Sequence, residues 1–133
     1  MPIELEMVLR LLLATALGAI IGYQRERAGK PAGLRTHILI CLGAAVFTVA
    51  SIYGFGAASD PARIAAGVVA GIGFIGAGAI LRSGEGIVAG LTTAATIWAV
   101  AGIGLAAGAG LYLVSAVATI LMLIVLFLPH PIR

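Results

Sequence analysis

Hydrophobic residues gather in five long stretches along this chain, and the breaks between the stretches are polar or rich in glycine and proline. The stretches cover residues 5–23, 36–55, 62–81, 87–105 and 111–128, and each holds about 18–20 residues. A bilayer core needs about 20 apolar residues per helix. The pattern therefore predicts an all-α polytopic membrane protein, a bundle of about five transmembrane helices.

Composition supports that prediction. Of the 133 residues, 62% are hydrophobic and 10% are charged, whereas an ordinary soluble domain is about 25% charged. So few charges cannot cover the surface of a water-soluble domain of this size. The composition excludes a soluble globule, a disordered tail and a nucleic-acid-binding domain, and the length provides one domain, 1–133.

The breaks also predict helix boundaries. Asp60 is expected to cap the third helix, with Pro61 at its first helical position. Residues 83–86 have the composition of a turn. The short connection 106–110 predicts a tight antiparallel hairpin of the last two helices, and Pro129 ends the chain's last helix.

Lysine and arginine in the connections predict the orientation, because cytoplasmic loops carry an excess of both. One side of the bundle holds six of them: Arg25, Arg27, Lys30, Arg35, Arg82 and Arg133. The other side holds only Arg10 and Arg63. We therefore expect the N-terminus outside and the C-terminus in the cytoplasm.

Small residues recur at helical spacing and predict close helix packing, which lipid tails do not otherwise drive. They form three groups: Ala14, Gly18 and Gly22; Gly67, Gly71 and Gly78; and Gly104 and Gly108. The alternative is that small residues are simply frequent here. Whether a group meets a helix of the same chain or of a second copy stays open, although we expect a homo-oligomer and favour a dimer.

One glycine motif is a decoy. The run 71–76 matches the dinucleotide-binding fingerprint, but that motif needs a preceding strand, and this run lies inside an apolar stretch. We expect no cofactor. His37 and His130 have no nearby His, Cys or carboxylate partner in the sequence, so no metal site is predicted at either, and Cys41 is expected to be a small buried apolar residue.

Polar residues gather around the first and third connections, which the topology places on one side. The candidates are Arg25, Glu26, Arg27, Lys30, Gly33, Arg35, Thr36, His37, Arg82, Glu85, Gly90, Thr92, Thr93 and Thr96. One interpretation is a basic anchor on anionic lipid headgroups. The other is an ordered polar site, in which Glu26 pairs with Arg35 or Arg82 and other cations hold an anion. The threonines either pack helices or line a polar cavity.

Acidic residues are scarce inside the stretches. Glu6 and Arg10 are spaced for a structural i, i+4 pair, and Tyr112 is expected to be an interfacial anchor. No carboxylate lies near the middle of a span, where ion pumps and proton relays usually carry one. Catalytic triads and phosphate loops are absent from the sequence, so no catalytic residue is predicted and an enzyme is not expected.

Four motifs, in order, resemble the MgtC/SapB membrane family. They are residues 26–37, 60–66, 71–78 and 90–98, and the likeness extends from about Gly18 to Tyr112. The resemblance implies motif positions on the cytoplasmic face at Glu26, Arg27, Gly33, Arg35, Thr36, Gly90, Thr92 and Thr93.

The resemblance also implies a bacterial inner-membrane protein. The family's best-known members help bacteria grow when magnesium is scarce and survive in a host, and the implied role is regulatory. One member is held to restrain the membrane sector of the F-type ATP synthase. Such members carry a soluble domain after the last span, which this sequence lacks, so a short member and a truncated chain both stay open.

Two functions therefore compete. The first is a regulatory membrane protein that acts by protein or lipid interaction, without nucleic acid. The alternative is a transporter or channel for magnesium or another small ion, built by oligomerisation. A membrane enzyme acting on lipid headgroups has only the Arg, Glu and Thr cluster in its favour.

Overall fold

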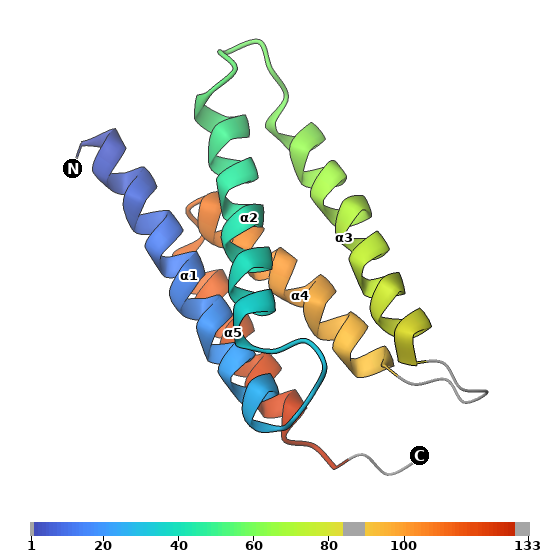
Figure 1. The fold of residues 1–133 in the computed structure, drawn as a ribbon. Coiled ribbons are helices and arrows are strands. Elements are labelled where there is room, and N and C mark those ends of the chain that lie inside the picture. Colours follow the sequence, from blue (N-terminus) through green and yellow to red (C-terminus); the bar gives the residue numbers. More distant parts are fainter. Residues whose placement is uncertain (1, 84–89, 130–133) are drawn as a thin grey trace.

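The computed structural model describes residues 2–83 and 90–129, and within those ranges the protein is all-helical (Figure 1). Its helices are α1 (Ile3–Arg27), α2 (Leu34–Tyr53), α3 (Pro61–Ser83), α4 (Leu91–Gly108) and α5 (Tyr112–Leu126). Helices α1 to α4 are long and apolar enough to cross a membrane, and α5 is a shorter apolar helix. The predicted all-α bundle is confirmed.

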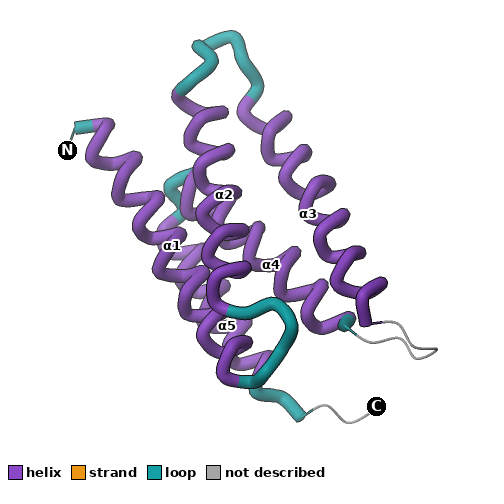
Figure 2. The backbone as a smooth tube through the Cα atoms, in the orientation of Figure 1, coloured by secondary structure: helices purple, strands orange, loops and turns teal. Residues whose placement is uncertain are grey.

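The helices alternate in direction, so the connections fall at two ends of the bundle (Figure 2). The end that we call the Arg25 end holds the α1–α2 connection, the start of α4 and the end of α5. The opposite end, the Arg10 end, holds the N-terminus, the α2–α3 connection and the α4–α5 turn. The first connection and the beginning of α4 therefore meet at one end, as the predicted topology requires.

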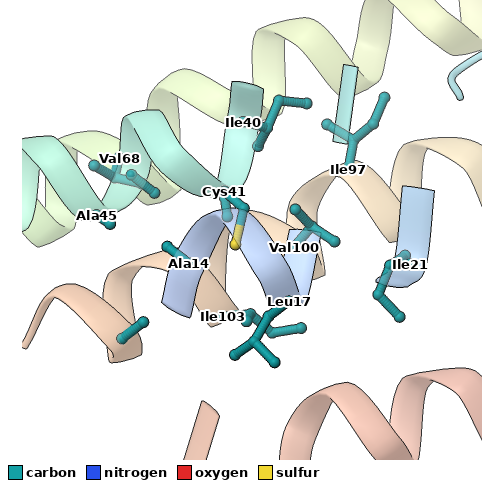
Figure 3. Close-up of a cluster of buried hydrophobic side chains, with 13 residues drawn as sticks. Ala14, Leu17, Ile21, Ile40, Cys41, Ala45, Val68, Ile97, Val100 and Ile103 are labelled. Carbon is teal, nitrogen blue, oxygen red and sulfur yellow. The ribbon is translucent and has the colours of Figure 1, made fainter. Parts of the chain in front are cut away.

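Helix α4 is the centre of the bundle, because it contacts each of the other four helices. Of its residues 56% are buried, whereas only 6% are buried in the 18-residue apolar segment of α3 within Pro61–Ile80. The core consists of small and branched side chains from α1 to α4, among which Cys41 lies fully buried (Figure 3). Small side chains allow these helices to approach closely.

The outer surface of the bundle is apolar. Phe74 is 81% exposed, Leu113 is 77% exposed and Phe127 is 72% exposed. Apolar patches of this extent mark a surface that does not face water. Together with the four helices of spanning length, this surface makes the chain a multi-pass membrane protein.

Several helix ends differ from the predicted ones. Helices α1 and α2 each begin two residues earlier than expected, and α1 continues to Arg27, whereas α3 begins at Pro61 after the Asp60 cap, as predicted. Gly29 follows α1 at φ +73°. The N–H of Gly29 bonds the carbonyl of Glu26, and the N–H of Lys30 bonds the carbonyl of Arg25, which ends the helix. Such a C-terminal motif favours glycine because a side chain is strained at positive φ.

Helix α4 is displaced by a few residues along the sequence. It begins at Leu91, after Gly90 at φ +83°, and it continues to Gly108, where Gly110 at φ +86° forms the same C-terminal motif. The connection to α5 is consequently shorter than predicted, and α4 and α5 pack in contact as an antiparallel hairpin. Helix α5 ends at Leu126, because the residues before Pro129 are disfavoured in a helix.

Candidate functional site

Two groups of small residues bring α1 and α4 against α2. A Cβ placed on Gly18 would lie 2.8 Å from the Cβ of Cys41, and one on Gly22 would lie 2.9 Å from the Cα of Leu34. On α4, a Cβ at Gly104 would collide with the carbonyl group of Cys41. A Cβ on Gly108 would lie 2.7 Å from the carbonyl oxygen of Ala45. Ala14, the first small residue of the α1 group, is fully buried.

The glycines of α3 lie elsewhere. A Cβ on Gly67, Gly71 or Gly78 would have no atom of the described chain within 4 Å. Gly67 and Gly71 line an apolar groove of about 560 Å³ between α2 and α3, and Arg63 is the charged side chain among its described lining residues. Whether a second copy covers these glycines stays a prediction. The fingerprint-like run 71–76 lies inside α3.

At the Arg25 end, a buried arginine links α1 to α4. The Arg25 side chain is 3% exposed, and its Nη2 atom donates a hydrogen bond of 2.7 Å to Oγ1 of Thr93. Its Nε atom is buried and has no hydrogen-bond partner among the described residues. A buried guanidinium commonly has a carboxylate partner, so this one is incompletely satisfied.

The imidazole of His37 links α2 to α4 beside that arginine. Its Nδ1 lies 2.9 Å from the carbonyl oxygen of Gly33, and its Nε2 lies 3.0 Å from Oγ1 of Thr96. A carbonyl can only accept, so Nδ1 carries a hydrogen. In the neutral ring Nε2 then accepts from the Thr96 hydroxyl, which alternatively donates to the carbonyl of Thr93 at 2.9 Å.

Glu26 caps α2. Its Oε1 atom accepts a hydrogen bond of 2.9 Å from the backbone N–H of Leu34, the first residue of that helix. A Cβ on Gly33 would overlap the same oxygen, so glycine leaves room for the carboxylate. In the part of the chain that the structure describes, Glu26 forms this cap instead of the expected ion pair with Arg35.

Apart from Gly90, the other candidates at this end either are exposed or have side chains outside the described residues. Arg27, Lys30, Arg35, Thr36 and Thr92 are exposed, and Gly90 precedes α4. Arg27 donates a 2.8 Å bond to the Tyr23 hydroxyl and lies over its ring. The side chain of Arg82, and Glu85 as a whole, lie outside the described residues. The structure therefore gathers Arg25, Glu26, Gly33, His37, Thr93 and Thr96, and leaves the exposed cations around them.

At the opposite end, Arg10 makes the contacts that Arg25 lacks. It pairs with Glu6 at 3.2 Å, as predicted, and it donates a 3.0 Å bond to the carbonyl oxygen of Gly108. Its guanidinium also lies over the Tyr53 ring. The Tyr112 hydroxyl donates to Glu6, so Tyr112 joins this network in addition to any contact with the membrane interface.

The sequence interpretation missed that both arginines are buried. Arg10 precedes Ala14 by four residues, and Arg25 follows Gly22 by three, so both continue the small-residue stripe of α1. That spacing places both arginines on the helix face of the small residues, and it could have predicted their burial. Within the described ranges, no three His, Cys, Asp or Glu side chains come together as a metal site. The gathered donors are suited to binding an anion or to holding helices together.

Comparison with known proteins gives one family and several relatives. The MgtC family matches residues 11–133. The chain is 47% identical to the "Putative magnesium transporter YhiD" of Escherichia coli K12, with 94% of this chain and 61% of that protein covered. It is 41% identical to "Protein SapB" of Bacillus subtilis, with 98% and 60% covered.

"Protein MgtC" of Salmonella typhimurium LT2 is 48% identical, with 87% of this chain and 49% of that protein covered. The chain thus spans less than two thirds of the length of these three relatives. No solved structure matches the chain.

Proposed function

Since the chain belongs to the MgtC family, we propose that it is a regulatory protein of a bacterial inner membrane. It acts by binding a protein or lipid at the Arg25 end, which faces the cytoplasm, and it is not an enzyme. The role concerns adaptation to low magnesium, in keeping with the relative named as a putative magnesium transporter.

The observation that carries the proposal is the buried Arg25 guanidinium between α1 and α4. A fixed, buried positive charge at this end of the bundle repels a divalent cation, since desolvated like charges interact strongly over short distances. The Arg25 end is therefore poorly suited to conduct Mg²⁺ through a single chain.

Three of the described carboxylates, Glu6, Glu26 and Asp60, support the same view, because each has a structural partner. Glu26 caps α2, Asp60 accepts a 3.0 Å bond from the N–H of Ala62 at the start of α3, and Glu6 pairs with Arg10. Mg²⁺ prefers carboxylate oxygens and retained waters as ligands. These three carboxylates therefore hold helix ends together in the structure.

The decisive experiment is magnesium flux into proteoliposomes containing the purified chain. The proposal predicts no uptake above that of protein-free vesicles, with a known magnesium channel as positive control. In cells, the Arg35→Glu variant should still insert in the membrane but should lose the low-magnesium phenotype, because it reverses an exposed charge at the Arg25 end, where the partner binds. Arg63→Glu, at the opposite end, is the matched control and should keep the phenotype.

The alternative is a magnesium transporter or channel, and the name of the Escherichia coli relative favours it. Oligomerisation would then build a pore that one chain lacks, with the groove-lining glycines of α3 in the interface. Uptake of magnesium that is lost in Glu26→Gln would establish this alternative over the regulatory role.

Orientation has its own test. Lys30→Cys and Asp60→Cys in a Cys41→Ala background give one reactive thiol at each end of the bundle. In intact spheroplasts an impermeant maleimide should label the thiol at position 60 and spare the one at position 30. The reverse result would place the Arg25 end outside the cell.

A further inference from the structure

The first turn of α4 exposes backbone donors at the Arg25 end. Among the described residues, the earliest backbone hydrogen bond of this helix runs from Ala94 N–H to the carbonyl of Gly90, so the N–H groups of Leu91, Thr92 and Thr93 precede the helical ladder. Gly90 supplies no capping side chain, and no acidic residue lies in that turn. Leu91 is 57% exposed and Thr92 is exposed, so the helix end is accessible.

A second, independent feature lies directly behind that turn. Arg25 is 97% buried, since only 3% of it is exposed, and its Nη2 contacts Thr93 in the same turn of α4. Its Nε has no partner among the described residues. The nearest described carboxylate in the sequence, Glu26, is already bonded to the N–H of Leu34.

The two features have the same electrical sign. A helix N-terminus carries about half a positive charge, and the guanidinium carries a full one. Holding a buried guanidinium next to this positive helix end costs free energy unless a negative group joins them. The comparison with Arg10 within the same chain makes this plain, because that arginine, also buried, has both a carboxylate and a carbonyl oxygen as partners.

We propose that the first turn of α4 and the Arg25 guanidinium form a binding site for a phosphate-type oxyanion. Backbone N–H groups at a helix start bind phosphate directly, and arginine adds charge-assisted hydrogen bonds. The exposed Arg27, Lys30 and Arg35 raise the local concentration of anions. The phosphoryl group comes either from inorganic phosphate or from a phospholipid headgroup at the membrane face.

This inference rests on the proposed function for the binding role of the Arg25 end, whereas the chemistry of the site stands on its own. Magnesium uptake would overturn the regulatory role without changing a phosphate-binding result. Failure to bind phosphate would overturn the inference without changing the flux result.

Binding is measured on the full chain in detergent, after removal of lipid, by the thermal unfolding midpoint. Inorganic phosphate is compared with chloride at equal ionic strength. Phosphatidylglycerol-containing nanodiscs, with phospholipid retention read by native mass spectrometry, form the second arm. A rise with inorganic phosphate identifies a soluble ligand, and retention of one phospholipid without that rise identifies a headgroup.

Two variants at Thr92 make the test specific. Thr92→Glu places a carboxylate on the exposed first turn of α4. This carboxylate competes with the ligand for the backbone N–H groups and the guanidinium, so phosphate or phospholipid should bind about tenfold more weakly. Thr92→Gln has the same size without the charge and should bind like the unchanged chain. Arg25→Gln should lose binding, and Thr92→Glu keeps the test informative if that variant fails to fold.

Two results would overturn the proposal. The first is an unchanged chain that responds neither to inorganic phosphate nor to phospholipid. The second is a response of the same size in Thr92→Glu and Thr92→Gln, because then the ligand would bind away from the first turn of α4.

Discussion

Nη1 of Arg10 donates a 3.0 Å hydrogen bond to the carbonyl oxygen of Gly108, so the first helix closes the C-terminal end of the fourth. A cation at a helix C-terminus also complements the negative end of the helix dipole. Residues 98 positions apart in the chain are thereby joined at the Arg10 end of the bundle.

Replacing this arginine should destabilise the bundle. In Arg10→Met the carbonyl of Gly108 loses its donor and Glu6 loses its ion pair, and we expect a loss of about 1.5–3 kcal/mol in the free energy of unfolding. Unfolding by SDS in mixed micelles, followed by circular dichroism, measures it. Arg27→Met is the control, since that side chain is exposed and its partner Tyr23 is exposed as well. Equal losses in both variants would show that the buried contact contributes nothing particular.

The two glycines of α4 at 102 and 104 should respond oppositely to alanine. A methyl group at Gly104 would overlap the backbone of Cys41, so α2 and α4 must separate, at a cost of about 1–3 kcal/mol. At Gly102 nothing lies within 4 Å, and the better helix propensity of alanine should stabilise the protein by up to about 1 kcal/mol. The same SDS titration measures both. A destabilised Gly102→Ala would mean that another molecule occupies that face.

The single cysteine reports on this packing without any engineering. Cys41 is fully buried among α1, α2 and α4, so maleimide should modify it only when the helices separate. Labelling in detergent should be slow in the unchanged chain and in Gly102→Ala, and fast in Gly104→Ala. Mass spectrometry follows the modification over time. Rapid labelling of the unchanged chain would contradict the packing around Cys41.

Much of the fold could be predicted from the sequence because lipid imposes simple rules. Apolar runs of spanning length give the helices, and the placement of Asp60 before Pro61 gives the start of α3. The positions of Gly90 and Gly110 were harder to interpret, because sequence alone does not say which glycine adopts positive φ. Predicted ends of α4 were consequently displaced by a few residues.

The candidate site was predictable as a set of residues but not as a set of contacts. Arginine is expected at a membrane surface, so hydropathy places Arg25 in the connection, whereas its register with Gly18 and Gly22 places it inside. Glu26 has several cations within reach in the sequence, yet it bonds a backbone N–H, because α2 starts directly beside it. Such choices depend on which helices pack together, which periodicity leaves open.

The hydrogen bond between His37 and Thr96 gives the last prediction. Thr96→Val keeps the shape of the side chain but removes the hydroxyl, which leaves Nε2 of a buried imidazole without its partner. We expect a loss of about 1–3 kcal/mol in the free energy of unfolding, and Thr96→Ser should restore most of it. Thr92→Val is the matched control one turn earlier on α4, where the side chain is exposed and the change should be within about 0.5 kcal/mol.

A spectroscopic readout separates this bond from general packing. The bond to the Gly33 carbonyl requires a hydrogen on Nδ1, so ¹⁵N spectra of the His37 ring should show the Nδ1–H tautomer when the ring is neutral. In Thr96→Val the Nδ1 signal should persist while the Nε2 signal shifts, because only Nε2 loses its partner. A neutral ring protonated at Nε2 instead would contradict the bond from Nδ1–H to the Gly33 carbonyl.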